Sequence, residues 1–381
     1  MVDHPEYYCW LGALGAAIFE AGETRKRSFK RIHQLRQHAG KQTFACSEPL
    51  SMEGVLLLRD RVADVTVPAQ GKIDAYLGID IGSVSTNLVA IDTHGNLLHE
   101  IYLRTQGRPI EVVDKGLEEI EQVLGDRLNV LGVGTTGSGR ELIGELVGAD
   151  TVNDEITAHK TGAMHVSERL GMERVYTIFE IGGQDSKFIR IDDGVVVDFT
   201  MNEACAAGTG SFLEEQAEKL GISIKGEFAQ LALASTKPAR LGERCTVFME
   251  RDVTSLLLKG AEVGDLAAGL AYSVALNYLN RVVRGRKIGG VIFFQGGTAY
   301  NDAVAAAFSQ ILGKRIIVPP HNGVIGAIGM ALIAQEVMQQ RGRPASKFRG
   351  YHLDRVTRGA PHLQGLESCR LVAPLASLYV D

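Results

Sequence analysis

Two stretches of the sequence share an acidic residue at the end of an apolar run, followed by glycine and small polar side chains. In GIDIGSVSTN the acidic residue is Asp80, and in FEIGGQDSK it is Glu180, with Asp185 close behind. Glycine lets backbone N–H groups approach an anionic ligand, and carboxylates are ligands that Mg²⁺ prefers. Two such hairpin turns could hold a phosphate chain and its metal ion from opposite sides.

The polar residues of the two turns define the candidate phosphate and metal site. Asp80 and Asp185 are the expected magnesium ligands, directly or through water. Gln184 is placed with them as a candidate catalytic residue. The glycines would supply backbone N–H groups, and the hydroxyl and amide side chains would donate to phosphate oxygens. These cofactor-binding candidates are Gly82, Ser83, Ser85, Thr86, Asn87, Gly182, Gly183 and Ser186.

A third glycine turn, in FFQGGTAYN, follows another apolar run. Its pair Gly296 and Gly297 would let a flat adenine or a ribose lie close to the backbone. A further glycine-rich loop, residues 132–141, is expected near the same cleft. One glycine turn alone is weak evidence, because hairpin turns need glycine anyway. Two acidic–glycine turns followed by an apolar run that ends in Gly-Gly are much more specific for a nucleotide site.

Two of the five cysteines precede amphipathic runs that predict helices. Cys205 lies in NEACAAGTGSFLE and Cys245 in GERCTVF. The N–H groups and dipole of a helix N-terminus favour a thiolate, which is the form that binds a metal. From spacing alone, burial as small apolar fillers explains the two cysteines equally well. Two ligands are too few for a 4Fe–4S cluster, but a two-fold dimer would supply four.

Four other residues near these motifs carry weaker signals. Glu155 and His159 form an i, i+4 pair in a predicted helix, which favours a capped surface or cleft-lining helix over a metal or general-base site. Lys187 is a candidate phosphate ligand, although the alternation of its strand favours solvent exposure. Glu203, beside Cys205, could connect the nucleotide state to that cysteine, a hypothesis that rests on adjacency alone.

The elements that must position these residues alternate between strands and helices. A strand–turn–strand unit occurs at about 75–104 and again at about 175–202, and a helix is expected at about 109–125. The predicted fold class is therefore α/β, with two duplicated strand–hairpin–helix lobes that face a cleft. The lobes are expected at about 75–180 and 181–335.

The segment before the main domain suggests that the chain derives from a protein with two copies of this domain in tandem. Residues 12–19, GALGAAIF, resemble residues 326–333, GAIGMALI, with four identities in eight positions. Residues 1–74 are therefore interpreted as a remnant of a preceding copy of the domain plus a linker, with chance similarity between Ala/Gly-rich helices as the alternative. Residues 336–381 form a C-terminal extension to which the sequence assigns no structure.

Composition bounds the cellular setting. The chain has 381 residues and a formal net charge of −5, which argues against a broad nucleic-acid surface. No run approaches the ~18 apolar residues of a membrane span. An odd number of cysteines in a long chain does not fit a secreted disulfide framework. The expected setting is a reducing cytoplasm, with neither nucleic acid nor membrane as a partner.

The motifs DIGSVSTN, EIGGQDSK, NEACAAGTGSFLE, RCTVF and QGGTAYN, in this order, resemble those of the activator ATPases of 2-hydroxyacyl-CoA dehydratases. These proteins are relatives of the ATPase subunits of benzoyl-CoA reductase and belong to the actin-like and sugar-kinase-like superfamily. The resemblance covers about residues 75–335. It implies ATP or ADP with Mg²⁺ between the lobes, and one 4Fe–4S cluster that is held by Cys205 and Cys245 and shared across a homodimer.

The resemblance also implies ATP-driven electron transfer. An electron from ferredoxin or flavodoxin would pass through the chain to a 2-hydroxyacyl-CoA dehydratase or a benzoyl-CoA-reductase-like component. Cys9, Cys46 and Cys369 match no ligand motif. Two other functions fit the same fold: a small-molecule kinase that acts on an amino sugar or a carboxylate, and a nucleotide-switched binding protein with no redox role.

Overall fold

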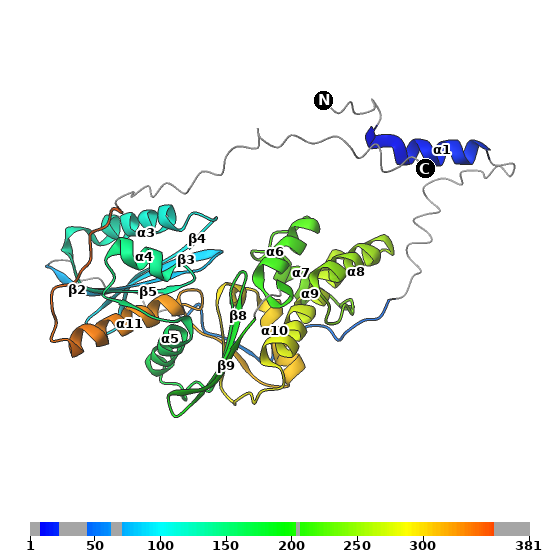
Figure 1. Ribbon diagram of the computed structural model, residues 1–381. Coiled ribbons are helices and arrows are strands. Elements are labelled where there is room, and N and C mark those ends of the chain that lie inside the picture. The colour runs from blue at the N-terminus through cyan, green and yellow to red at the C-terminus, as the bar shows by residue number, and fades with distance from the viewer. Residues whose placement is uncertain (1–7, 23–43, 62–70, 203–205, 354–381) are drawn as a thin grey trace, which may run out of the picture.

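The computed structural model describes residues 8–22, 44–61, 71–202 and 206–353. Its strands form two sheets, one in each of two lobes (Figure 1). The five-stranded sheet has the order β4-β3-β2-β5-β6, and the six-stranded sheet has the order β1-β11-β10-β7-β8-β9. Each lobe has an apolar core of its own. The predicted two-lobed α/β fold is confirmed.

The first lobe is built from three antiparallel strands followed by a helix and a parallel strand. β2 pairs antiparallel with β3, β3 pairs antiparallel with β4, and β5 returns parallel to β2. Helix α3 begins at Pro109, near the predicted start, because the fixed φ of proline suits the first turn. The bounds are β2 Ile73–Ile81, β3 Ser85–Asp92, β4 Leu97–Arg104, α3 Pro109–Leu124, η2 Gly125–Arg127, β5 Leu128–Gly137, α4 Arg140–Val147 and β6 Thr151–Val152.

The second lobe repeats this plan. β7, β8 and β9 form an antiparallel run, and β10 lies parallel to β7 as β5 lies parallel to β2. Figure 1 shows helices α6 to α10 gathered beside this sheet. The bounds are β7 Thr177–Ile181, β8 Ser186–Asp192, β9 Val195–Met201, η3 Ala206–Gly208, α6 Gly210–Lys219, α7 Glu227–Ala234, α8 Thr246–Leu258, α9 Val263–Tyr278, η4 Leu279–Val283, β10 Ile292–Gln295, η5 Gly297–Tyr300, α10 Asp302–Leu312 and β11 Ile316–Val318.

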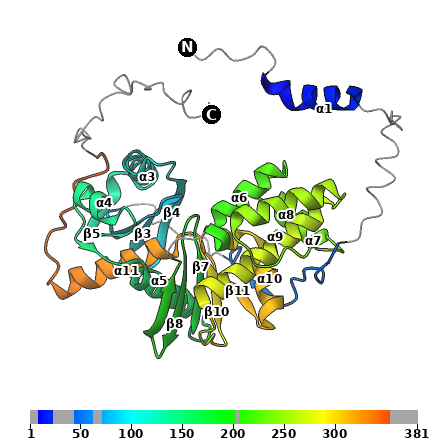
Figure 2. The ribbon, with the colours of Figure 1, turned by 45° about the vertical axis from the view of Figure 1, so that its right-hand side comes forward.

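Two helices pack against each other between the sheets: α5 (Glu155–Arg169) and α11 (Ile325–Gln340) (Figures 1 and 2). Their contact needs glycine, because a Cβ atom at Gly329 would lie 1.8 Å from the Ala158 carbonyl oxygen. Helix α11 also packs on β2 and β5. The lobes are therefore not contiguous in sequence, and the span 181–335 includes a helix that covers the first-lobe sheet.

The segment upstream of residue 75 contributes one strand to the second lobe. β1 (Val55–Leu57) pairs parallel with β11. Further upstream, η1 (Tyr8–Trp10) leads into α1 (Leu11–Gly22), which has no buried side chain. The similar residues 326–333 lie in the largely buried α11. The interpretation of residues 1–74 as a remnant of a preceding domain stays a prediction.

The start of the C-terminal extension packs on the first lobe. The Ser346 hydroxyl donates to a side-chain oxygen of Asp150 at 2.6 Å, and the Leu353 N–H donates to Asp114 at 2.8 Å. Residues 354–381 lie outside the described residues. Across the described ranges, every helix is too short or too polar to cross a membrane.

Candidate functional site

The two acidic–glycine turns have the same backbone geometry. In the first turn, the Gly82 N–H donates to the Ser85 carbonyl oxygen at 2.9 Å. In the second turn, the Gly182 N–H donates to the Asp185 carbonyl oxygen at 3.0 Å. The duplication that the sequence predicts therefore extends to corresponding backbone hydrogen bonds.

The tips of the two turns touch across the lobes. Val84 of the first turn lies against Gly183 of the second, where a Cβ atom would approach the Val84 side chain to 2.4 Å. Helix α6 begins on the second turn, because the N–H groups of Gly210 and Ser211 donate to the carbonyl oxygens of Gly182 and Gly183 at 2.9 and 2.8 Å. Both turns and the N-terminus of α6 therefore surround one space.

A cavity of about 580 Å³ occupies this space. The loop at 132–141 contributes Ser138 to its wall, and α5 contributes Glu155 and His159, so this helix lines the cleft. Most of the residues predicted for nucleotide and metal binding also line it. They are Asp80, Gly82, Ser83, Ser85, Asn87, Gly182, Gly183, Gln184, Asp185, Gly296 and Gly297.

Two predicted phosphate ligands do not line this cavity. Thr86 is fully buried, and its hydroxyl lies 2.9 Å from the Thr105 hydroxyl. Ser186 is also fully buried, and its N–H donates to the side-chain oxygen of Asn202 at 2.7 Å. The geometry therefore gives these two residues a supporting place behind the turns, whereas their neighbours face the cavity.

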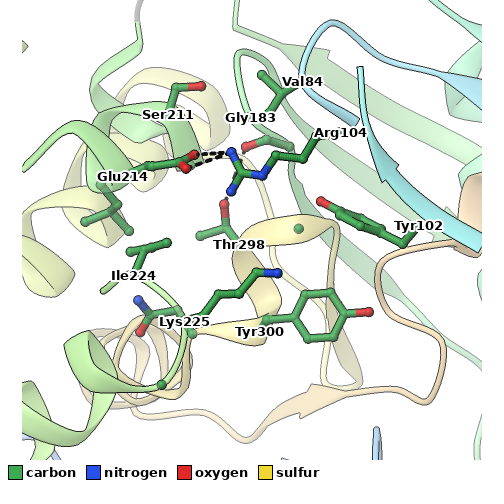
Figure 3. A pocket seen from close by; sticks show the side chains of 16 residues that line it. Val84, Tyr102, Arg104, Gly183, Ser211, Glu214, Ile224, Lys225, Thr298 and Tyr300 are labelled. Atoms are coloured by element: carbon green, nitrogen blue, oxygen red, sulfur yellow. Dashed lines mark hydrogen bonds and ion pairs between the residues drawn. The ribbon is translucent and has the colours of Figure 1, made fainter. Parts of the chain in front are cut away.

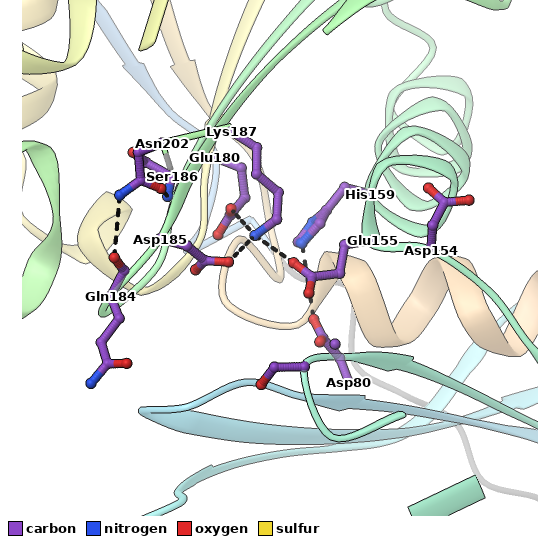
Figure 4. A network of polar contacts seen from close by, with 12 residues as sticks. Asp80, Asp154, Glu155, His159, Glu180, Gln184, Asp185, Ser186, Lys187 and Asn202 are labelled. Atoms are coloured by element: carbon purple, nitrogen blue, oxygen red, sulfur yellow. Dashed lines mark hydrogen bonds and ion pairs between the residues drawn. The ribbon is translucent and has the colours of Figure 1, made fainter. Parts of the chain in front are cut away.

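Lys187 is the centre of a charge network in the cavity wall (Figure 4). Its Nζ lies 2.6 Å from Glu155, 3.0 Å from Glu180 and 2.8 Å from Asp185. The side chain is 3% exposed, so the solvent exposure favoured by strand alternation is wrong: this strand face borders the polar cleft. Burial acts to lower the pKa of Lys187, but the three carboxylates outweigh it and raise this pKa well above its usual value.

Asp80 lies on the other side of the cavity and faces a neutral histidine. Burial raises the pKa of Asp80 to about 7, with help from the Glu155 charge. Burial lowers the pKa of His159 to about 3, so its ring is neutral. His159 Nδ1 accepts from the Gln295 amide at 2.9 Å, which leaves the ring hydrogen on Nε2, 4.0 Å from Asp80. Asp80 is thus a buried oxygen donor that a divalent cation would suit.

A second cavity, of about 490 Å³, adjoins the first, and Val84, Gly183 and Gly297 line both. Figure 3 shows Tyr102 and Tyr300 on one side of it, and their ring centroids lie 6.1 Å apart. A Cβ atom at Gly297 would lie 2.6 Å from the Tyr102 hydroxyl, so the Gly-Gly turn allows close approach. This space beside the polar cavity offers the apolar, aromatic surface that a nucleobase needs.

Of the two predicted cluster ligands, Cys245 is described and Cys205 is not. Cys245 is exposed and is the N-cap residue of α8. The Val247 N–H is the main group that lowers the pKa of the Cys245 thiol, and Thr246, Phe248 and Arg281 act in the same direction. A lowered thiol pKa favours the thiolate, which is the form of cysteine that binds a metal. Cys205 and Glu203 lie outside the described residues, just before η3 and α6.

Cys9 and Cys46, predicted as non-ligands, are exposed and free. The structure gives no second thiol beside either of them among the residues it describes. Cys369 lies outside the described residues. The assignment of Cys205 and Cys245 as ligands stays a prediction.

Sequence reasoning missed two polar residues of the site, Gln295 and Asn202. Gln295 is fully buried at the end of β10 and orients His159. A polar residue that ends an apolar strand before Gly-Gly is the signal that could have found it, because buried polar groups need partners. Asn202 follows β9, and its side-chain oxygen accepts a hydrogen bond from the Ser186 N–H. It is the first residue of the motif NEACAAGTGSFLE, and that motif was the signal that could have found it.

Comparisons with known proteins agree with this geometry. The model of the BadF/BadG/BcrA/BcrD ATPase family matches residues 77–334. The (R)-2-hydroxyglutaryl-CoA dehydratase activating ATPase of Acidaminococcus fermentans is 32% identical over 262 residues, which cover 68% of this chain and 96% of that protein. An uncharacterised protein of Methanocaldococcus jannaschii is 32% identical over 265 residues, and the match spans 68% of this chain but only 61% of that relative.

Among solved structures, the activator of 2-hydroxyisocaproyl-CoA dehydratase from Clostridium difficile with bound ADPNP has a TM-score of 0.63 and 28% identity. The match covers 71% of this chain and 98% of that chain. The match with the family model spans most of this chain, from before the first turn to α11. The chain therefore belongs to the BadF/BadG/BcrA/BcrD ATPase family.

Proposed function

We propose that this chain binds MgATP between its two glycine turns and uses ATP hydrolysis to drive an electron from an iron–sulfur cluster to a partner enzyme. The partner would be a 2-hydroxyacyl-CoA dehydratase or a related reductase, as the names of its relatives suggest. One observation carries the proposal: α6 is hydrogen-bonded directly to the second turn and begins just after Cys205. A change at the phosphates would therefore reach the cluster ligand through residues 206–209, which separate Cys205 from the N-terminus of α6.

The residues of the cavity suit phosphoryl transfer to water. Asp80 would hold Mg²⁺, with Asp185 on the opposite turn as a further ligand, directly or through water. Gly82 and Gly183 present their backbone to the phosphates. Gln184 would orient the attacking water. Such a reaction needs positioning and charge stabilisation more than covalent catalysis.

Lys187 and its carboxylates set the charge of the site. The lysine Nζ lies 2.6 to 3.0 Å from Glu155, Glu180 and Asp185. Movement of the ammonium out of the cavity wall would therefore leave buried carboxylates without a positive partner. The lysine would offset part of the negative charge that a nucleotide brings. Glu155 comes from α5 between the lobes, so this ion pair also links the helix to the second turn.

Cys245 supplies the described half of the proposed cluster site. Its exposure at the start of α8 leaves the thiol accessible to a second subunit. Two chains would together offer four thiolates from Cys205 and Cys245, the usual number for a 4Fe–4S cluster. When bound, such a cluster takes up and gives up single electrons, and ferredoxin or flavodoxin is the proposed donor.

Iron analysis of oxygen-free protein tests this proposal. We expect about four iron and four sulfide per two chains, with broad absorbance near ~400 nm. Cys245→Ser should lose the iron, whereas Cys46→Ser, an exposed cysteine outside the motifs, should keep it. Iron-free wild-type protein would refute the redox role. ADP release that depends on a hydroxyl or carboxylate acceptor would favour the kinase alternative instead.

A further inference from the structure

Strand β4 presents three exposed side chains at alternating positions along the edge of the first-lobe sheet. They are Glu100, Tyr102 and Arg104. Side chains two residues apart in a strand share one face. The residues between them, such as the buried Ile101, pack into the first-lobe core. The outward face of β4 is therefore a short row of an acid, an aromatic ring and a base.

Each member of this row contacts a different element of the second half of the chain. Arg104 Nη1 lies 2.7 Å from Glu214 on α6. The Tyr102 ring meets the Tyr300 ring edge to face, with an interplanar angle of 83°. The row thus contacts α6 at one end and η5, just after the Gly-Gly turn, in the middle (Figure 3).

Glu100 completes the row at the other end. Its side-chain oxygen lies 2.6 Å from Nδ1 of His321, in the turn between β11 and α11. His321 has a φ of 58°, a left-handed conformation that is uncommon outside glycine. We call the three pairs Arg104–Glu214, Tyr102–Tyr300 and Glu100–His321 the interlobe latch. Tyr102 and Tyr300 also border the space that suits a nucleobase, whereas the two charged pairs have no role assigned above.

The latch forms one wall of the second cavity. Tyr102, Arg104, Glu214 and Tyr300 all line that cavity, so its shape depends on the two lobes being held together at this row. The side chains of Arg104 and Glu214 are 45% and 38% exposed, and an exposed ion pair alone contributes little. Three contacts in one row can act together, because each requires the same approach of β4 to the second lobe.

Helix α6 packs into the second-lobe core through Phe212, Leu213 and Ala217, and it also has a contact with the first lobe. Its first N–H groups are bonded to the second glycine turn, and Glu214 is bonded to Arg104 of the first lobe. The helix therefore connects the second glycine turn, which borders the first cavity, to the edge strand of the first lobe.

We propose that the interlobe latch positions α6 when the lobes close, with Arg104 as the positioning residue that ties α6 to the first lobe. The latch stands on the contacts above; its effect on the iron–sulfur segment before α6 rests on the proposed function.

Hydrogen exchange of backbone amides, read by mass spectrometry on the whole chain, tests the latch with and without MgADP. Arg104→Glu should speed exchange of the α6 amides about three- to tenfold, because a weak attraction becomes a repulsion. Glu214→Arg should do the same, and it also places a base near the N-terminus of its own helix. The double reversal Arg104→Glu with Glu214→Arg should return the α6 rates most of the way to wild type.

Arg108→Glu is the matched control. Arg108 is also exposed in the first lobe, but its ion pair with Glu111 stays within that lobe. This variant should leave α6 exchange at wild-type rates. The latch is overturned if Arg104→Glu gives the same α6 exchange as Arg108→Glu, or if the double reversal restores nothing.

The same experiment separates the latch from the proposed function. Protection of peptides 80–87 and 180–187 by MgADP reports nucleotide binding at the two turns. Absence of that protection would count against the proposed function, while the α6 rates of the nucleotide-free variants would still decide on the latch. Protection at the turns with unchanged α6 rates in Arg104→Glu would reject the latch and leave the nucleotide site standing.

Discussion

Across its hairpin from Asp80, strand β3 carries Asn87, whereas β8 carries Lys187 across from Glu180. The two turns share the same glycine-to-carbonyl hydrogen bond, so their backbones correspond. Their charges do not. Lys187 pairs with three carboxylates, while the Asn87 side-chain oxygen has no hydrogen-bond partner among the described residues.

This difference shows that the duplication kept the shape of the turn and changed its electrostatics. The second turn carries its own cation, buried between carboxylates. The first turn has a buried carboxyl, Asp80, whose pKa is raised to about 7 because burial disfavours its charge. A bound divalent cation would stabilise the charged form of Asp80. The two turns would therefore serve different tasks in the proposed site, with Asp80 as a metal ligand and Lys187 as a fixed positive charge.

Removal of Lys187 should have the largest effect on stability. Lys187→Met leaves buried carboxylates without a cation, which costs on the order of 3–5 kcal/mol of unfolding free energy. The control Lys219→Met removes an exposed lysine that pairs with Glu215 and Glu250, and should cost about 0.5 kcal/mol or less. Denaturant unfolding of both variants measures this, and similar losses for the two would contradict the account.

The cost of Lys187→Met should depend on pH. Burial raises the pKa of Glu180 to about 8. A carboxyl with a raised folded-state pKa stabilises the folded protein below its unfolded pKa of about 4.3, and this contribution is lost as the pH rises through the folded value. The orphaned carboxyls of the variant can take up protons in acid. The destabilisation should therefore be smaller at about pH 5 than at about pH 8.5.

Asp80→Asn should abolish most ATP hydrolysis while leaving the fold intact. Loss of one transition-state or metal contact typically lowers kcat about 100-fold, and a buried neutral amide carries no charge to desolvate. Asp74→Asn, at the opposite end of β2, is the control, because Asp74 is exposed and bonds Asn129. It should keep kcat within about twofold. Equal kcat for the two variants would remove Asp80 from the proposed metal site.

Added volume at Gly183 should disturb the contact between the two turns more than loss of a hydroxyl at the matching Ser83 does. Gly183→Ala places a Cβ against Val84, and overpacking of this kind costs about 1–3 kcal/mol. We expect KM for ATP to rise about tenfold, and Val84→Ala in the same chain should reverse part of it. Ser83→Ala at the matching position of the first turn should change KM about twofold. Steady-state kinetics would reject the contact if Gly183→Ala behaved like Ser83→Ala.

Asn87→Ala should have the smallest effect of the series. The Asn87 oxygen makes no hydrogen bond in the described part of the chain, so truncation should lower the unfolding free energy by about 1 kcal/mol or less. A loss as large as that of Lys187→Met would mean that the matched positions of the two turns carry equal weight. The same denaturant titration compares both variants.

Local patterns predicted much of the fold and the cavity. The turns around Gly82 and Gly182 follow apolar strands, and their glycines and acidic residues indicated the site. The burial of Lys187 could not be predicted in this way, because its carboxylate partner Glu155 comes from a helix elsewhere in the chain. The return of α11 to the first lobe is equally nonlocal: its apolar residues indicate burial but do not say which sheet covers them.

The role of the cysteines could be predicted from the sequence only in part. The position of Cys245 before a helix was visible in the sequence, and the structure adds its exposure and the N–H groups that lower the pKa of its thiol. The proposed pairing with Cys205 and with a second chain would depend on contacts between segments, which no local pattern encodes. The Arg104–Glu214 pair of the latch has the same character, because its members come from separate lobes.

The most direct test of the account is the electron paramagnetic resonance spectrum of the dithionite-reduced protein before and after addition of MgATP. The N-terminus of α6 is bonded to the second glycine turn and follows the segment that contains Cys205. If the turn binds phosphate as proposed, MgATP should change the spectrum of the wild type and leave that of Asp80→Asn unchanged. A reduced cluster whose spectrum ignores MgATP, in protein that hydrolyses ATP normally, would contradict the coupling at the centre of this account.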